Sequence, residues 1–118
     1  MDKYCITKSY TIMEAIEKID ENHDRAILVK NDCDKIVGLL TQGDIIRALI
    51  NGKDLYSEVN GILKHDFYYL TEKNMEVAYE IFSKKKITLL PIVDNNFKLI
   101  EVVTLNDVYA YMEAKKFE

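Results

Sequence analysis

Two threonines, each followed three residues later by an aspartate, are the residues in this sequence whose types and spacing best suit chemistry. Thr41 and Asp44 stand where an apolar, β-prone run gives way to an apolar helical pattern. Thr104 and Asp107 repeat this spacing near the C-terminus. A hydroxyl beside a carboxylate can hold vicinal hydroxyls such as those of a ribose, and a helix N-terminus favours phosphate.

The same spacing also has a purely structural interpretation, as a helix cap. Threonine at the N-cap accepts a hydrogen bond from the first helical turn, and an acidic residue three positions later complements the cap and the helix dipole. Recurrence of the pair favours a binding role, as does Gly43, which lets the backbone approach another group closely. Arg47, one turn beyond Asp44, could reach a phosphate or instead pair with a surface carboxylate.

Both corners belong to a duplicated unit. Sliding the sequence on itself by 63 residues superposes, without a gap, five identical residues and a matched hydrophobic pattern. The identical pairs are Ala15 and Ala78, Glu17 and Glu80, Lys35 and Lys98, Thr41 and Thr104, and Asp44 and Asp107. We therefore expect a first unit at 1–52, an ordered linker at 53–65 and a second unit at 66–118.

Each unit should begin with a short strand followed by a helix. The strands are expected at 4–6 and 67–70, which are rich in aromatic and β-branched residues. Thr11 and Glu14 form a capping-box signature before the first helix, and Asn74 is a plausible N-cap for its counterpart.

A hairpin and a second helix complete each unit. Strands are expected at 26–30 and 89–93, and the polar turns that follow predict antiparallel pairing with a third strand. Pro91 favours an edge or bulged strand. The last helix of the first unit should run to about Asn51, where Gly52 suits a C-terminal stop. The fold class is α+β, with two β-α-β-β-α units packed around a pseudo-two-fold axis.

Composition limits the function classes. The 118 residues are 48% hydrophobic and 31% charged, as in globular proteins. With 16 basic and 20 acidic residues and a net charge of −4, the chain lacks the basic face that nucleic acid requires. The N-terminus lacks a signal-peptide layout, and no apolar run approaches the ~20 residues that span a bilayer. We expect a cytoplasmic location and no membrane or nucleic-acid partner.

The remaining cysteines, histidines and motifs predict neither catalysis nor metal binding. Cys5 and Cys33 are too few and too far apart for a disulfide framework and are interpreted as free thiols. His23 and His65 are not at metal-ligand spacing. No nucleophile-and-base set and no Walker-type loop can be proposed from the spacing. The chain is not expected to be an enzyme.

These features together resemble a known family. The first corner reads Gly38, two apolar residues and then Thr-x-x-Asp, and a second Thr-x-x-Asp follows in tandem. This pattern is similar to that of a pair of cystathionine-β-synthase (CBS) domains, or Bateman module. The run Leu-Leu-Pro-Ile-Val-Asp at 89–94 resembles the family's Leu-Pro-Val-Val-Asp strand. The sequence from 37 to 49 more narrowly resembles CBS pairs linked to sugar-phosphate nucleotidyltransferases.

The resemblance implies a regulatory module that binds an adenine nucleotide (AMP, ADP or ATP) between the repeats. Asp44 and Asp107 would contact ribose, with Thr41 and Thr104 beside them. The residues implied to line the base and phosphate regions are Lys8, Arg25, Ala26, Thr71, Thr88 and Leu89. The resemblance also implies a homodimer through the helices, to which Tyr109, Tyr111 and Met112 would contribute, and an attached or partner nucleotidyltransferase.

Two departures from the family pattern set the repeats apart and leave alternatives open. Glu101 replaces Gly38 in the second unit, which places a carboxylate near a site meant for an anion. Position 46 is Ile where the nucleotidyltransferase-linked pattern often has a second Arg. The first corner is therefore the better candidate for an occupied site. A structural dimerisation module without ligand, and a binder of S-adenosylmethionine or a similar adenosyl compound, remain alternatives.

Overall fold

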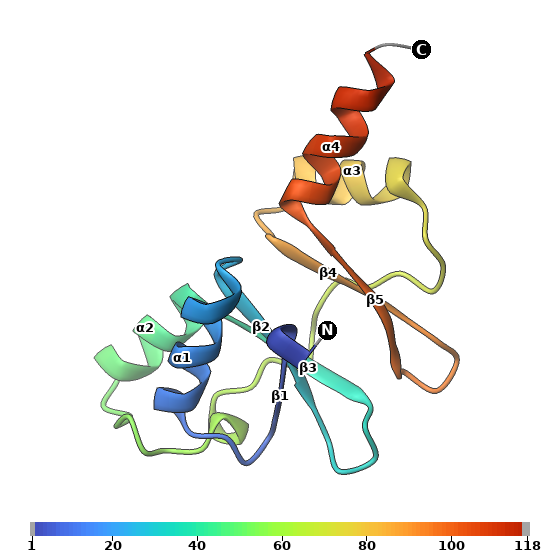
Figure 1. The fold of residues 1–118 in the computed structure, drawn as a ribbon. Helices are drawn as coiled ribbons and strands as arrows, with labels where there is room; N and C mark the ends of the chain where they lie inside the picture. Colours follow the sequence, from blue (N-terminus) through green and yellow to red (C-terminus); the bar gives the residue numbers. More distant parts are fainter. Residues whose placement is uncertain (1, 117–118) are drawn as a thin grey trace.

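The computed structural model describes residues 2–116, which form two lobes of similar construction (Figure 1). The first repeat contains β1 (Cys5–Thr7), α1 (Ile12–Asn22), β2 (Ala26–Lys30), β3 (Ile36–Thr41) and α2 (Gln42–Ile50). The second contains α3 (Met75–Lys84), β4 (Leu89–Val93), β5 (Leu99–Thr104) and α4 (Leu105–Lys115). Two short 3-10 helices, η1 (Asp2–Tyr4) and η2 (Val59–Gly61), are also present. The predicted α+β fold of two related repeats is confirmed.

The β2–β3 and β4–β5 hairpins are antiparallel, as predicted, and have the same register in both repeats. Ala26 pairs with Thr41 in the first hairpin, and Leu89 pairs with Thr104 in the second. Each threonine thus ends its strand beside the first residue of the neighbouring strand. The hairpin register therefore fixes where both Thr-x-x-Asp corners begin.

Irregularities of the hairpins are also repeated. Both ladders shift register after equivalent residues, Val29 and Ile92. The turn residues Asp34 and Phe97, equivalent under the 63-residue shift, have left-handed φ angles of 64° and 61°. The register shift therefore belongs to the repeat and does not depend on Pro91, which only the second repeat contains.

The prediction of a strand at 67–70 was wrong, because only one residue of this segment pairs with the sheet. β1 pairs in parallel with β2 over three residues, whereas in the second repeat Leu70 alone forms a parallel bridge, to Ile92. The preceding aromatic residues pack on one another instead. The Tyr69 ring lies 4.9 Å from the Phe97 ring, edge to face. Ring packing over the hairpin turn thus takes the place of strand pairing.

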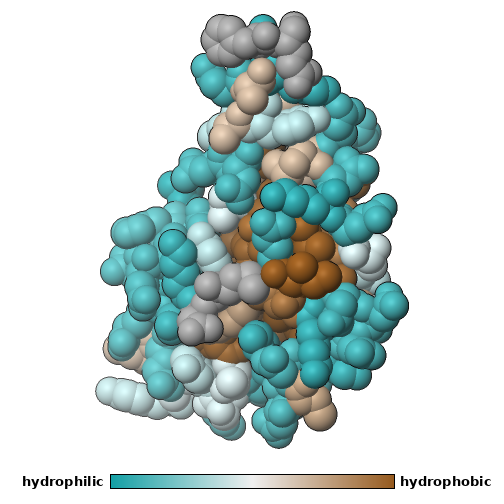
Figure 2. Space-filling view, turned by 45° about the vertical axis from the view of Figure 1, so that its right-hand side comes forward, coloured by the Kyte–Doolittle hydropathy of each residue, from teal (hydrophilic) through white to brown (hydrophobic). Residues whose placement is uncertain are grey.

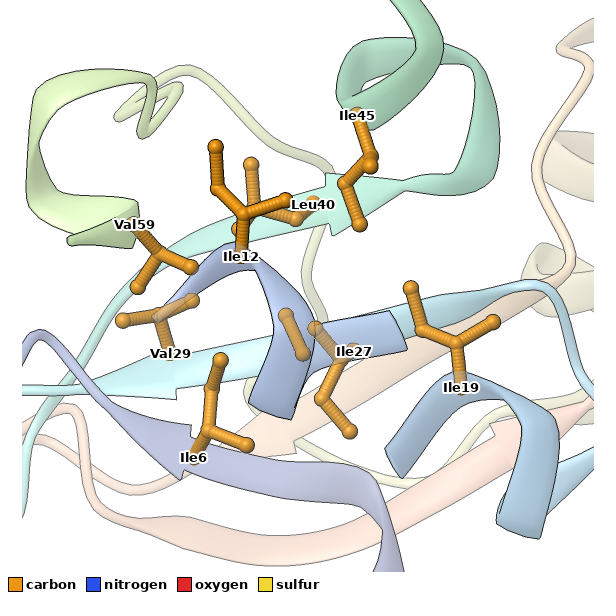
Figure 3. Close-up of a cluster of buried hydrophobic side chains, with 9 residues drawn as sticks. Ile6, Ile12, Ile19, Ile27, Val29, Leu40, Ile45 and Val59 are labelled. Atoms are coloured by element: carbon orange, nitrogen blue, oxygen red, sulfur yellow. The ribbon is translucent and has the colours of Figure 1, made fainter. Parts of the chain in front are cut away.

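Strand β2 is buried on both faces, which explains its uninterrupted apolar sequence. Ile27 and Val29 point into the core of the first repeat, where Figure 3 shows them with side chains from α1, β3 and α2. Ala26 and Leu28 pack against the second repeat, in a cluster that includes Leu89 of β4. The two repeats therefore share a core, and Figure 2 shows hydrophobic side chains concentrated in the middle of the molecule.

The linker between the repeats lies against the first repeat. Val59 is fully buried, and the Ile12 N–H donates a 2.9 Å hydrogen bond to the Ser57 carbonyl. Its helical content is the single turn of η2. Across residues 2–116, none of the helices has the length and apolar character needed to cross a bilayer.

Candidate functional site

The first Thr-x-x-Asp corner forms a complete capping box. The Thr41 N–H donates to Asp44 Oδ2 at 2.9 Å, and the Asp44 N–H donates to Thr41 Oγ1 at 3.1 Å. Thr104 and Asp107 form the same pair of bonds, at 2.8 Å and 3.2 Å. A third box caps α1. The capping interpretation is therefore realised at both corners, and any binding role must come in addition to it.

Two cations distinguish the first corner from the others. Arg47 Nη2 lies 2.7 Å from Asp44 Oδ1, and Lys64 Nζ lies 3.0 Å from the same oxygen. The Asp44 side chain is only 6% exposed, whereas those of Arg47 and Lys64 are 62% and 61% exposed. Burial alone would raise the pKa of Asp44, but hydrogen bonds from Thr41, Lys64 and Arg47 outweigh burial and hold this pKa below its ordinary value. The corner thus presents a buried, ionised carboxylate beneath two cations that reach the surface.

Gly43 makes room for one of these cations. A Cβ atom at this position would lie 3.3 Å from Arg47 Nη1, closer than ordinary van der Waals contact. The Arg47 side chain folds back over the start of α2, where it contacts Asp44. The glycine anticipated as a place of close approach therefore accommodates the guanidinium.

The corner opens into a cleft of about 280 Å³ between the repeats. It is lined by Leu39, Thr41, Asp44, Arg47, Lys64, Asp66, Phe67, Tyr68, Ile87 and Leu89. Aromatic and aliphatic side chains of both repeats thus stand beside two cations, Arg47 and Lys64, and two carboxylates, Asp44 and Asp66. A third cation lies near the rim, because Lys85 Nζ is 5.7 Å from the centroid of the Tyr68 ring. This combination suits a ligand with a flat apolar group, hydroxyls and an anionic group.

The second corner has a different environment. Asp107 is exposed and lines a separate hollow of about 330 Å³ formed within the second repeat. Glu101 lines this hollow too, with its Oε1 3.3 Å from Lys73 Nζ. Position 110 is alanine where the first repeat has Arg47. The expected carboxylate beside the second corner is therefore present.

Tyr4 lies near two carboxylates around the second corner. Burial raises the pKa of Tyr4, and the nearby carboxylates of Asp24 and Asp107 raise it further. Under the 63-residue shift Tyr4 is equivalent to Phe67, which lines the cleft at the first corner. A phosphate placed at the second corner would approach the carboxylates of Asp24 and Asp107 without the arginine that the first corner has, which is electrostatically unfavourable.

Five other residues implied by the resemblance lie outside the first cleft. Arg25 lines a groove between α1 and α2, and Ala26 is buried in β2. Lys8 follows β1, where its N–H donates to the β2 backbone and its carbonyl accepts from the linker. Thr71 is exposed, and Thr88 donates a hydrogen bond to the backbone of the first repeat. The structure therefore brings Leu89, but not these five, to Thr41, Asp44 and Arg47.

Sequence reasoning missed several lining residues, above all Lys64 of the linker. Its signal was the exchange of Gly38 for Glu101 between the repeats. A Cβ atom on Gly38 would lie 2.4 Å from Leu63 Cδ1 and 2.6 Å from the Lys64 carbonyl oxygen. The glycine marks the place where the linker crosses β3, and this crossing delivers Lys64 to Asp44.

Metal binding has no geometric support in the described part of the chain. Among residues 2–116, no three or more histidine, cysteine, aspartate or glutamate side chains gather closely enough to hold a metal ion.

Comparison with known proteins identifies the family. The CBS domain model matches residues 1–51 and 59–114, that is, both repeats. An uncharacterized 17.7 kDa protein of Acidianus ambivalens is 30% identical over 107 residues, covering 89% of this chain and 64% of that protein. Arabinose 5-phosphate isomerase GutQ of Escherichia coli O6:H1 is 31% identical over 100 residues, covering 84% of this chain and 31% of the isomerase. The chain spans less than two thirds of the length of these relatives.

Solved structures have the same fold. The CBS domains of a transcriptional regulator from Streptococcus pneumoniae superpose with a TM-score of 0.78 at 18% identity, covering 92% of this chain and 89% of that one. The CBS domain protein PAE2072 from Pyrobaculum aerophilum, complexed with AMP, gives a TM-score of 0.75 at 19% identity, with coverage of 93% and 90%. The cytosolic domain of the Mg²⁺ channel MgtE in complex with ATP gives 0.73 at 22% identity, with coverage of 92% and 45%. The chain therefore belongs to the CBS domain family, and its two repeats form a CBS domain pair.

Proposed function

We propose that this chain is a regulatory module that binds an adenine nucleotide in the cleft at the first Thr-x-x-Asp corner. The observation that carries the proposal is the pairing of buried, ionised Asp44 with the surface cations Arg47 and Lys64. They line one cleft with aromatic and aliphatic side chains of both repeats. Its volume of about 280 Å³ is just below the ~300–1,000 Å³ of drug-sized ligand sites, so a small ligand such as a mononucleotide is proposed.

Each part of a nucleotide has a counterpart in the cleft. Ribose hydroxyls would donate to Asp44, whose carboxylate already accepts hydrogen bonds from Thr41, Arg47 and Lys64. When the hydroxyls occupy Asp44, Arg47 and Lys64 become available to the phosphate, for which a guanidinium offers paired donors. The Tyr68 ring and the side chain of Leu89 offer an apolar surface to the base.

The AMP and ATP complexes of similar fold described above support an adenine nucleotide as the ligand class. Within this class, the first corner is the proposed site. The second corner has Ala110 in place of Arg47, and Asp24 and Glu101 nearby, so it is proposed to bind phosphate weakly or not at all.

Isothermal titration calorimetry with AMP, ADP and ATP tests this function. The intact chain should bind at least one of them with a stoichiometry of one per chain, and Asp44→Ala should abolish the binding heat. Asp107→Ala is the matched control, because it removes the equivalent carboxylate of the second corner and should leave the binding constant unchanged. Absence of binding by the intact chain at millimolar nucleotide would contradict the proposal.

One observation favours the alternative of a structural module without ligand. Asp44 Oδ1 and Oδ2 already have partners in the protein, so the corner is satisfied without a ribose. The other alternative is tested by including S-adenosylmethionine in the same titrations. This compound carries a sulfonium cation where a nucleotide carries the phosphate that Arg47 and Lys64 would bind.

The proposal extends to the module's context. The chain itself has no proposed catalytic role and would control an attached or partner protein in the cytoplasm. The sequence resemblance suggests a sugar-phosphate nucleotidyltransferase for that role, and the similarity to the GutQ isomerase adds another sugar-phosphate enzyme as a candidate.

A homodimer through the helices is also proposed, because Ile46, Ile50 and Tyr109 of α2 and α4 are more than half exposed. A monomeric mass by light scattering at tens of micromolar would contradict the dimer.

A further inference from the structure

The linker fills a groove on the first repeat and bonds to both of its walls. The Ile12 N–H, at the start of α1, donates to the Ser57 carbonyl at 2.9 Å. The Leu39 N–H of β3 donates to the Lys64 carbonyl at 3.4 Å. Between these bonds Val59 is fully buried, in the core cluster that contains Ile12 (Figure 3). The groove therefore holds a polypeptide segment through one buried apolar side chain and the backbone edges of α1 and β3.

The hollow of about 330 Å³ beside the second corner is the equivalent groove of the second repeat. Met75 and Val102 line this second groove, and the 63-residue shift equates them with Ile12 and Leu39. Ile12 is fully buried, whereas Met75 at the same place in α3 is only partly buried. The second repeat thus keeps the groove, and within residues 2–116 this groove is open.

The edge of β5 presents a backbone donor to the second groove. The Leu70 N–H donates to the Pro91 carbonyl at 2.9 Å, so this carbonyl faces away from β5. In an antiparallel ladder, the residue directly opposite then faces away from its neighbouring strand as well. Val102 is opposite Pro91 and lines the second groove. Its N–H therefore has the place that the Leu39 N–H has towards the linker, and sheet edges of this kind pair readily with another chain.

The charge of the second groove favours a basic occupant. In the first repeat, Lys64 of the linker lies 3.0 Å from Asp44. The equivalent Asp107 is exposed and lines the second groove. Glu101 adds a second carboxylate, and Lys73, 3.3 Å from it, is the one cation among the lining residues. A segment with basic side chains would complement the remaining negative charge.

Glu101 also determines which residue fits beside it. Its counterpart Gly38 leaves room for the linker, because a Cβ atom at position 38 would overlap the Leu63 side chain. The side chain of Glu101 takes part of that room in the second groove. A leucine would therefore clash with Glu101 and desolvate its carboxylate. A lysine or arginine can instead extend along the surface and pair with the carboxylate.

We propose that the second groove binds a basic segment of a partner protein. The Val102 N–H donates to a backbone carbonyl of this segment, and an apolar side chain of the segment covers Met75. A lysine or arginine of the segment pairs with Glu101 and Asp107. The module thereby holds its partner on the repeat that is proposed to bind no nucleotide. The contact lies outside the nucleotide cleft and does not depend on nucleotide binding.

A peptide copied from the linker serves as the probe. It spans residues 54–64, keeps Val59 as the apolar residue and carries Leu63→Lys, which places a lysine at Glu101. In an NMR titration of the intact, isotope-labelled chain, the peptide should shift the amide signals of Val102 and Met75. The dissociation constant should be below about 1 mM.

Two control peptides separate the charged contact from the apolar one. One carries Leu63→Glu, which opposes Glu101, and the other carries Val59→Asp together with Leu63→Lys. Each should bind at least about fivefold more weakly than the probe. Equal binding of the three peptides, or no shift at several millimolar probe, would overturn the proposal.

The position of the shifted signals decides between occupants. Shifts at Ile12 and Leu39 in place of Met75 and Val102 would mean that the probe displaces the linker from the first repeat, and would overturn the proposal. Shifts at Met75 and Val102 on concentrating the chain without peptide would assign the second groove to another copy of the chain, and would overturn it too.

Charge reversal in the protein is the second measurement. In Glu101→Lys, the Leu63→Glu peptide should bind more tightly than the Leu63→Lys peptide. Asp107→Asn should weaken binding of the Leu63→Lys peptide about two- to fivefold, the usual effect of one exposed ion pair. Asp44→Asn is the matched control and should leave this binding unchanged. Circular dichroism verifies that each variant is folded. An unreversed preference in Glu101→Lys, or equal effects of the two aspartate substitutions, would contradict the proposal.

Discussion

At the residue scale, Gly38 determines where the linker can cross the first repeat. Leu63 and the Lys64 carbonyl occupy the space that a side chain at position 38 would need. Lys64 in turn lies 3.0 Å from Asp44. The absence of one Cβ atom in β3 is thus connected to the position of a cation in the proposed site.

Gly38→Ala should therefore destabilise the protein by about 1–3 kcal/mol, the usual cost of inserting an atom into a packed position. Urea unfolding measures the loss. Because the linker must shift, nucleotide binding should also weaken if Lys64 contacts phosphate. Glu101→Ala, at the equivalent and partly exposed position of the second repeat, should change stability by less than about 0.5 kcal/mol. Equal losses at the two positions would contradict the role given to Gly38.

Asp44 should make stability depend on pH in a defined direction. Its pKa in the folded state lies below its ordinary value, which is about 3.9 in an unfolded chain. Ionised Asp44 therefore contributes stability that is fully present above about pH 4 and is lost as the pH falls through the folded-state pKa.

The measurement is urea unfolding at intervals between pH 6 and pH 3. Asp44→Asn should lose less stability across this range than the unchanged chain, because its amide does not titrate. Arg47→Ala and Lys64→Ala should each show a smaller loss too, because removing a hydrogen-bond donor lets the Asp44 pKa rise towards its ordinary value. Identical pH profiles for all four proteins would refute this account of the corner.

At the element scale, three helices begin with the same capping box but only one box lies in the proposed cleft. Thr11, Thr41 and Thr104 each accept a hydrogen bond from the backbone three residues later. Replacing each by alanine should cost about 1 kcal/mol of stability, the typical worth of an N-cap.

Nucleotide binding should separate the three threonines. We expect Thr41→Ala to weaken the binding measured by calorimetry, whereas Thr11→Ala and Thr104→Ala leave it unchanged at temperatures where all variants are folded. Thr41→Ser should retain both the cap and the binding, because it keeps the hydroxyl. If all three alanine variants bind equally, the hydroxyl of Thr41 serves the helix alone.

These elements also show what local sequence can and cannot predict. Capping boxes and hairpin turns depend on residues within a few positions of one another, so the corners and β2–β3 could be predicted from the sequence. The segment 67–70 has strand-forming residues, yet only Leu70 reaches the sheet. Its pairing depends on where the linker delivers the chain and on ring packing between Tyr69 and Phe97, which are distant in sequence.

At the scale of the whole molecule, the same limit applies to the candidate site. Thr41, Asp44 and Arg47 are neighbours on one corner, so their proximity could be predicted. Lys64 and Ile87 reach the cleft only because the linker crosses β3 and the second repeat packs on the first. The sequence predicted two corners and, through Glu101, a difference between them. The linker crossing, which brings Lys64 to Asp44 alone, is a further difference that the sequence did not predict.

The shared core between the repeats leads to a prediction about cooperativity. Ala26 and Leu28 of β2 pack with Leu89 and other residues of the second repeat, so neither repeat keeps its sheet covered when the other unfolds. A lesion confined to one repeat should therefore destabilise both.

Leu90→Ala tests this coupling, because Leu90 is fully buried in the separate core of the second repeat. The substitution should cost about 2–5 kcal/mol and leave a single unfolding transition. Hydrogen exchange at the Ile27 amide, in the first repeat, should accelerate by the factor that corresponds to this loss. Tyr56→Ala, on the exposed linker, should change neither quantity. Unchanged exchange at Ile27 beside accelerated exchange in β4 would mean that the repeats unfold independently. In that case, opening one repeat alone could release a ligand held between them.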